Sequence, residues 1–311
     1  MVTAAVTVSD TGEPGIWDQI FTFDNYGELL SLVHNSLLAG VLLGLVGGLV
    51  GVFVIMRDLP FAVHGISELS FAGAAAALLI GVNVVAGSLL GSLVAAAAIG
   101  VLGVRARDRN SVIGILMPFG LGLGVLFLSL YKGRAANKFG LLTGQIVAVD
   151  TPQMAWLLGT SLVVLAALAA IWRPLTFASA DPEVAAARGI PVRALSLVFM
   201  VVLGLAVALC VQIVGALLVL SLLVTPAAAA ARLTASPVLL PLLSVVFALI
   251  AMEGGILLAL GSAIPISPYV TTLSFAIYLV CRLVGGRRTR PGRRRRPAAQ
   301  GSQPVPARRE R

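Results

Sequence analysis

The sequence repeats stretches of roughly 20 mostly apolar residues, and this repetition constrains the fold more than any other feature. About nine such stretches lie at 37–56, 60–80, 84–104, 112–131, 154–172, 195–213, 215–231, 238–260 and 267–284. A helix of roughly 20 apolar residues spans the hydrocarbon core of a bilayer. Only 11% of the residues are charged, against about 25% in soluble domains. We therefore predict an all-α, polytopic transmembrane helix bundle of about eight or nine spans, with the sixth and seventh nearly fused.

The distribution of charge predicts the orientation of this bundle in a bacterial plasma membrane. Half of the 22 Lys and Arg residues lie from Arg282 onward, and basic flanks remain on the cytoplasmic side. Threading nine spans back from a cytoplasmic C-terminus also places Arg57, Arg109 and Arg232 inside and the acidic N-terminus outside. The loop with Lys132, which falls outside, is the exception, and a re-entrant segment near 139–150 or a count of eight spans would change this orientation.

Three regions follow from these assignments. Residues 1–34 form an external polar or amphipathic segment, residues 35–285 form the transmembrane domain, and residues 286–311 form a basic cytoplasmic tail. The tail is rich in Arg, Pro and Gly, a composition that is typical of disorder. We interpret it as a topology signal and an anchor for anionic lipid, and we expect no nucleic-acid partner.

Ionisable side chains inside membrane spans are costly, so each is a candidate functional residue. His64 and Glu68 lie four residues apart in the second span, which places them on one helix face. An imidazole nitrogen and a carboxylate oxygen can both bind a divalent transition metal. The alternative for this pair is a hydrogen bond that serves helix packing. Glu253 is a second acid in an otherwise uncharged span, where it is either a further ligand or an interhelical hydrogen-bonding group.

Small residues and one proline predict how the helices pack. Glycines recur through the first span from Gly40 to Gly51, and small residues also fill 73–77 and 95–100. Such faces let helix backbones approach closely, within one chain or between two subunits. Pro226 should break or kink the seventh span. The cysteines, Cys210 and Cys281, lie in separate apolar stretches and are interpreted as packing residues.

A short amphiphilic insert separates the fifth and sixth spans on the predicted cytoplasmic side. Asp181 is a plausible N-cap, Pro182 and Glu183 suit the first helical turn, and Gly189 can end the helix. A capped helix in this position is typical of a docking element. The alternative is an ordinary loop helix that lies on the membrane surface.

Several segments together resemble the ABC-type permeases that import zinc or manganese. They are Gly48–Arg57, Phe61–Gly73, Ile113–Leu116, Leu142–Ile146, the insert Asp181–Gly189, and Val214–Ala228. The resemblance covers about 35–285. It implies a homodimeric or paired permease, with no permanently bound cofactor and a transported divalent metal ion as substrate. It also implies a cytoplasmic ABC ATPase docked at Asp181, Glu183 and Gly189, and an extracellular metal-binding lipoprotein.

The chain departs from the family pattern at its expected metal ligands. Where the family has Asp-x3-His, this chain has His64 and Glu68, which keep one carboxylate and one imidazole in reversed order. Near Ala263 the family's acid is missing, and Glu253 is the candidate to supply that charge. We therefore expect His64, Glu68 and Glu253 to be transient ligands in the ion path. The residue types do not distinguish zinc from manganese.

Three other functions remain open from the residues. An ABC permease for a metal chelate would need a wider path and fewer ligand-type residues. An intramembrane metalloprotease is less favoured because the sequence contains no His-Glu-x-x-His. A structural or lipid-binding membrane protein would need neither the His64–Glu68 pair nor the docking helix. The sequence also lacks the phosphate-binding Gly-x4-Gly-Lys-Ser/Thr loop, so we expect a transport subunit whose partner hydrolyses ATP.

Overall fold

The computed structural model describes residues 33–103, 106–133, 140, 151–216, 218–260 and 265–288. Within these residues eight helices are long and apolar enough to span a membrane, and no strand occurs. The long helices are α3 (His34–Met56), α4 (Pro60–Ile80), α5 (Val84–Leu102), α6 (Ala106–Leu130), α8 (Thr151–Ala180), α10 (Val192–Val214), α13 (Leu239–Leu260) and α14 (Ile266–Arg288). The predicted all-α transmembrane bundle is confirmed.

The seventh apolar stretch differs from its prediction as a single span over 215–231. It forms two short helices, α11 (Val219–Leu223) and α12 (Thr225–Leu233), and neither is long enough to cross a bilayer. Pro226 lies in the first turn of α12, where its missing N–H costs least, so the predicted break occurs next to this proline. The count of long helices is therefore eight in the described part of the chain.

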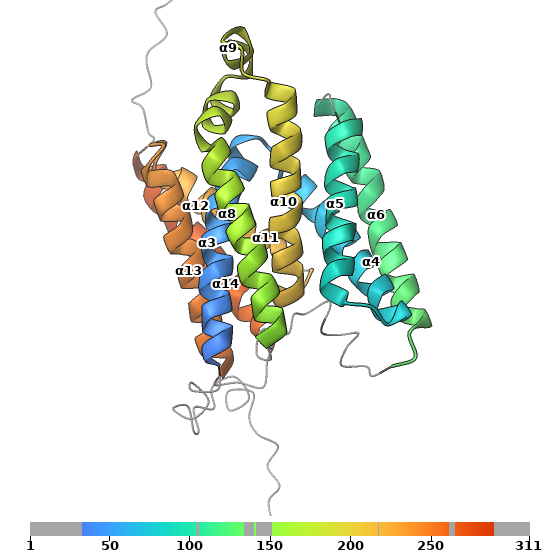
Figure 1. The fold of residues 1–311 in the computed structure, drawn as a ribbon. Coiled ribbons are helices and arrows are strands. Elements are labelled where there is room, and N and C mark those ends of the chain that lie inside the picture. Colours follow the sequence, from blue (N-terminus) through green and yellow to red (C-terminus); the bar gives the residue numbers. More distant parts are fainter. Residues whose placement is uncertain are drawn as a thin grey trace, which may run out of the picture.

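The two short helices nevertheless carry the chain from one end of the bundle to the other. At one end of the bundle they begin after Val214. The carbonyl oxygen of Val214 accepts a hydrogen bond from the hydroxyl of Ser267, at the start of α14. Midway, the α11 residue Leu222 lies against Gly47 of α3. At the far end, a Cβ on Gly285 of α14 would lie 2.2 Å from the carbonyl oxygen of Arg232. The described chain thus begins at one end of the bundle and finishes at the other (Figure 1).

The helices form two packed groups joined by α10 (Figure 1). One group contains α4, α5 and α6, and the other contains α3, α12, α13 and α14, while α10 packs on both α5 and α8. α3, α4 and α10 bury most of their residues, whereas the outer helices expose apolar side chains such as Leu90, Leu162 and Leu283. Exposed apolar helix faces are expected for a protein whose surroundings are lipid.

Glycine faces bring helix backbones together within the chain. On α3, Gly44 packs against the backbone of Leu249 in α13, and a Cβ on Gly48 would lie 2.6 Å from the Cα of Val245. On α4, a Cβ on Gly73 would lie 2.2 Å from the carbonyl oxygen of Gly87 in α5. The small-residue faces predicted from the sequence are therefore used for packing between helices of one subunit.

One end of the bundle collects the basic side chains. The turns between α3 and α4 and between α5 and α6, together with α9 (Pro182–Ala187), lie at this end, which we call the arginine end. Its described arginines include Arg57, Arg109, Arg188, Arg193 and Arg232. At the opposite end the exposed Lys132 follows α6. The predicted external segment 1–34 and basic tail 286–311 lie almost wholly outside the described residues, as do 139 and 141–150 and the region near Ala263.

Candidate transit site and docking helix

His64 and Glu68 lie on one face of α4 and point toward each other. The Nε2 atom of His64 is 3.7 Å from the Oε1 atom of Glu68. The Glu68 side chain is 6% exposed and that of His64 is 29% exposed, so the pair forms a partly accessible, mostly buried polar site. The shared face predicted from their spacing is confirmed.

The position of this pair depends on how α6 crosses α4. A Cβ on Gly120 of α6 would lie 3.0 Å from the backbone carbonyl carbon of Glu68, so the lack of a side chain at Gly120 permits the close approach. One turn earlier, Ile113 and Met117 of α6 lie near Gly65 of α4. α6 therefore packs closely along the segment of α4 that carries the pair.

Both residues retain buried polar atoms without a partner. Among the described residues, neither Nδ1 of His64 nor Oε2 of Glu68 has a hydrogen-bond partner. Buried polar atoms in folded proteins are nearly always hydrogen-bonded, so such exceptions call for an explanation. Oε2 of Glu68 therefore does not make the interhelical hydrogen bond of the packing alternative to any described residue.

The pair has the donor atoms and the spacing for two ligands of one divalent ion. Metal–nitrogen and metal–oxygen bonds of about 2.0–2.2 Å at tetrahedral angles place two ligand atoms roughly 3.3–3.6 Å apart. The observed separation of 3.7 Å is close to this value and needs little side-chain rotation to reach it. The site can therefore bind a cation through one nitrogen and one oxygen.

Glu253 lies elsewhere in the bundle, against α3. A Cβ on Gly40 would lie 2.5 Å from Oε1 of Glu253, so the carboxylate occupies the space that the missing side chain leaves. This oxygen is also buried without a hydrogen-bond partner among the described residues.

The structure does not bring Glu253 together with the pair on α4. His64 lies four residues, or about 6 Å, from the start of α4, and Glu253 lies fourteen residues, or about 21 Å, from the start of α13. Both helices start at the arginine end, so the two sites differ in depth. The described residues contain no group of three His, Cys, Asp or Glu side chains able to hold a metal.

The predicted docking helix forms as the sequence indicates. In α9, the backbone N–H of Val184 donates to Oδ1 of Asp181 at 3.0 Å, which is an N-cap bond. Gly189 has φ +82° and its N–H donates to the carbonyl oxygen of Ala186, so it ends the helix. Only Ala185 is buried within α9, and the helix projects beyond α8 and α10 (Figure 1).

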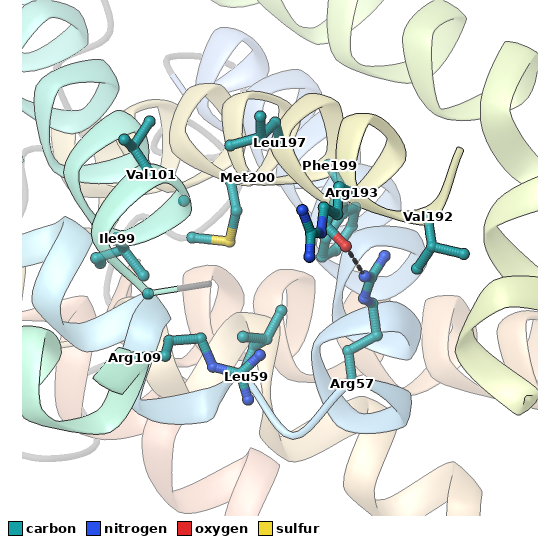
Figure 2. Close-up of a pocket in the computed structure, with 13 residues that line it drawn as sticks. Arg57, Leu59, Ile99, Val101, Arg109, Val192, Arg193, Leu197, Phe199 and Met200 are labelled. Atoms are coloured by element: carbon teal, nitrogen blue, oxygen red, sulfur yellow. Dashed lines mark hydrogen bonds between the residues drawn. The ribbon is translucent and has the colours of Figure 1, made fainter. Parts of the chain in front are cut away.

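One further polar site was not recognised from the sequence. Arg57, Arg109 and Arg193 line a cavity at the arginine end (Figure 2). In the sequence these residues indicate only orientation, because they belong to three separate segments. No local pattern could have shown that their side chains converge.

Comparison with known proteins places the chain among metal transport proteins. Residues 30–285 match the ABC 3 transport family. The manganese transport system membrane protein MntC of Halalkalibacterium halodurans is 31% identical over 239 residues, which are 76% of this chain and 81% of that protein. The high-affinity zinc uptake system membrane protein ZnuB of Haemophilus influenzae is 24% identical over 253 residues, which are 81% and 97% of the two chains.

A solved structure has the same fold. PsaBC from Streptococcus pneumoniae, determined in complex with Fab, matches with a TM-score of 0.73 and 25% sequence identity. The match covers 82% of this chain and 95% of that one.

Proposed function

Since this chain belongs to the ABC 3 transport family, we propose that it is the membrane permease of an ATP-driven importer of divalent metal ions, with zinc or manganese as substrate. The similar proteins carry both metals in their names, manganese for MntC and zinc for ZnuB. The observation within the chain that supports an ion path is the His64–Glu68 pair, with its unpartnered buried atoms and its separation of 3.7 Å.

A site with two protein ligands suits transport better than storage. Structural zinc sites use four protein ligands and hold the ion tightly, whereas sites with open positions keep water or exchange it. With one imidazole and one carboxylate, His64 and Glu68 would leave the remaining positions to water, so the ion could enter and leave. Glu253, at a different depth, would act as a separate point of negative charge along the path.

The donor types favour a bare ion over a metal chelate as substrate. A chelated metal has its coordination positions filled by the chelator and gains little from protein ligands. Buried nitrogen and oxygen atoms without partners are instead what a partly hydrated ion requires.

The energy for transport would come from a partner subunit. The sequence has no phosphate-binding Gly-x4-Gly-Lys-Ser/Thr loop, so a cytoplasmic ABC ATPase would hydrolyse ATP. We assign its docking to α9, because Asp181 and Gly189 fix both ends of this helix while Glu183 is exposed. A second permease subunit and an extracellular metal-binding lipoprotein would complete the importer.

The arginine end would face the cytoplasm. Arg57, Arg188 and Arg232 come from three different segments and lie at this one end, as the preference of basic residues for the cytoplasmic side requires. The docking helix α9 lies at the same end, where a cytoplasmic ATPase could reach it.

Uptake into proteoliposomes tests the proposed function. The permease would be co-expressed with a candidate ABC ATPase subunit, and the two would be reconstituted together and supplied with a metal-binding protein and ATP. We expect uptake of Mn²⁺ or Zn²⁺ that depends on ATP. Transport of a metal chelate without transport of either free ion would contradict the proposal, as would metal uptake that is unchanged when the ATPase is omitted.

A further inference from the structure

A cavity of about 370 Å³ opens at the arginine end, between the two packed groups of helices. It lies between the turn after α3, the end of α5, the start of α6 and the start of α10. Figure 2 shows Arg57, Arg109 and Arg193 around this space, each from a different one of these segments. Its volume falls within the range of about 300–1,000 Å³ that is typical of small-ligand sites.

The packing of α3 against α10 fixes one of the three guanidinium groups in place. Arg57 donates a hydrogen bond to Oγ of Ser196, and its guanidinium carbon lies 5.5 Å from the centre of the Phe199 ring. Phe53 of α3 packs edge-on against Phe199, with ring centres 5.9 Å apart. Arg57 is therefore held by residues of α10 and does not extend freely into solvent.

The positive charge in the cavity is not neutralised by the chain that is described. None of the described residues lining the cavity is acidic. Nη1 of Arg57 and Nε of Arg109 are buried without a hydrogen-bond partner among the described residues. Burial, together with the neighbouring charge of Arg109, lowers the pKa of Arg57. Buried cations without a partner are costly, so the cavity favours an anion.

The other walls of the cavity are apolar and lie where the spans end. Ile99 and Val101 come from the last turn of α5, and Leu197 and Met200 come from the first turns of α10. Val101 is 62% exposed and Leu197 is 39% exposed, so an apolar surface continues outward from the cavity. This level in the bundle corresponds to the boundary between the acyl chains and the headgroups of a bilayer.

We propose that this cavity binds the headgroup phosphate of an anionic phospholipid. Arg57, Arg109 and Arg193 donate to the phosphate oxygens, and an acyl chain lies along Val101 and Leu197. The apolar wall favours a lipid, because a soluble phosphate gains nothing from contact with it. Basic pockets between transmembrane helices are known to suit such headgroups. The site is separate from the His64–Glu68 pair and does not depend on which ion is transported.

Native mass spectrometry of the purified full-length permease in detergent tests this proposal. The protein would be titrated with phosphatidylglycerol and, in parallel, with phosphatidylcholine, which carries no net charge. Arg109→Gln and Arg193→Gln each remove one donor from the cavity. Arg193 is exposed, so its replacement should leave the fold intact. Arg232→Gln is the matched control, since Arg232 is an exposed arginine at the same end and does not line the cavity.

We expect retention of phosphatidylglycerol by the wild type and the control, and a loss of affinity of about tenfold in each cavity variant, as for one charge-assisted hydrogen bond. Equal phosphatidylglycerol binding by all four proteins would overturn the proposal. Equal retention of phosphatidylcholine by the wild type would also overturn it. Thermal stabilisation by inorganic phosphate, without retention of phosphatidylglycerol, would show a site for a soluble anion and would overturn the lipid assignment.

Discussion

The carboxylate of Glu253 on α13 lies in the space left by the missing side chain of Gly40 on α3. A Cβ added at Gly40 would lie 2.5 Å from Oε1 of Glu253 and 2.7 Å from Cδ1 of Ile256. The one acid of α13 is thus accommodated by a glycine that is more than two hundred positions away in the sequence. A side chain larger than that of glycine at position 40 would therefore collide with the carboxylate of Glu253.

We predict that Gly40→Ala destabilises the permease by about 1–3 kcal/mol, because the added methyl overpacks this contact. In the double variant Gly40→Ala with Glu253→Ala, the loss of stability should be smaller than the sum of the losses in the two single variants. Thermal unfolding in detergent measures both. Gly122→Ala is the control, since no atom lies within 4 Å of a Cβ at that position. Equal effects of Gly40→Ala and Gly122→Ala would contradict the prediction.

His64→Ala and Glu68→Gln should each reduce metal uptake by at least about tenfold without loss of folded protein. Each would remove one of the two proposed ligands, and the loss of a single metal–ligand interaction exceeds about 1.4 kcal/mol. The double variant should be little worse than the singles, because both residues act at one site. Ser67→Ala is the control, since Ser67 only hydrogen-bonds within its own helix, to the carbonyl oxygen of His64.

The exchange His64→Asp with Glu68→His separates ligand binding from packing. It keeps one carboxylate and one imidazole on the same helix face, so measurable uptake should remain if the pair binds the ion. Uptake at limiting metal that is normal in both single variants would exclude the pair from the path, and Glu253 would then be tested by Glu253→Gln.

The proposed docking role of α9 leads to a prediction about the residues that cap this helix. Asp181→Ala removes the N-cap bond to Val184 and should cost the helix about 0.5–2 kcal/mol, whereas Asp181→Asn preserves a cap. We expect Asp181→Ala to weaken co-purification of the ATPase and Asp181→Asn to leave it intact. The exposed charge reversal Glu183→Arg should also abolish uptake with the protein still folded in the membrane. Unchanged co-purification and uptake in both Asp181→Ala and Glu183→Arg would remove the docking role.

Gly189→Pro should weaken co-purification of the ATPase, as the loss of the N-cap in Asp181→Ala should. Proline cannot adopt φ +82° and has no N–H to donate to the carbonyl oxygen of Ala186. The amount of folded permease, measured by size-exclusion chromatography in detergent, should stay constant, because nothing lies within 4 Å of a Cβ at Gly189.

Accessibility from outside the cell tests the orientation. In intact cells a membrane-impermeant thiol reagent should label Lys132→Cys, because Lys132 is exposed at the end opposite the arginine end. The same reagent should not label Arg188→Cys, which is exposed at the arginine end. The native Cys210 and Cys281 are buried and should give little background. Labelling of Arg188→Cys alone would reverse the proposed orientation.

Local features were predicted well where the cause lies within one helix. The shared face of His64 and Glu68 follows from a spacing of four residues, and the structure confirms it. The N-cap at Asp181 and the helix end at Gly189 follow from residue type and are likewise confirmed. The stretch 215–231, which was predicted as one span that Pro226 breaks or kinks, is divided into two short helices next to this proline.

The sequence by itself determined that the chain is an all-α membrane bundle, because apolar stretches of about 20 residues cannot remain in water and must satisfy their backbone groups within helices. It also determined the His64–Glu68 face and the capped helix at Asp181. Only the tertiary structure decided that Glu253 lies on Gly40, at a different depth from that pair, and that Arg57 and Arg109 face the same cavity. These relationships depend on which helices cross and at which height, and such contacts between distant segments leave no local pattern in a single sequence.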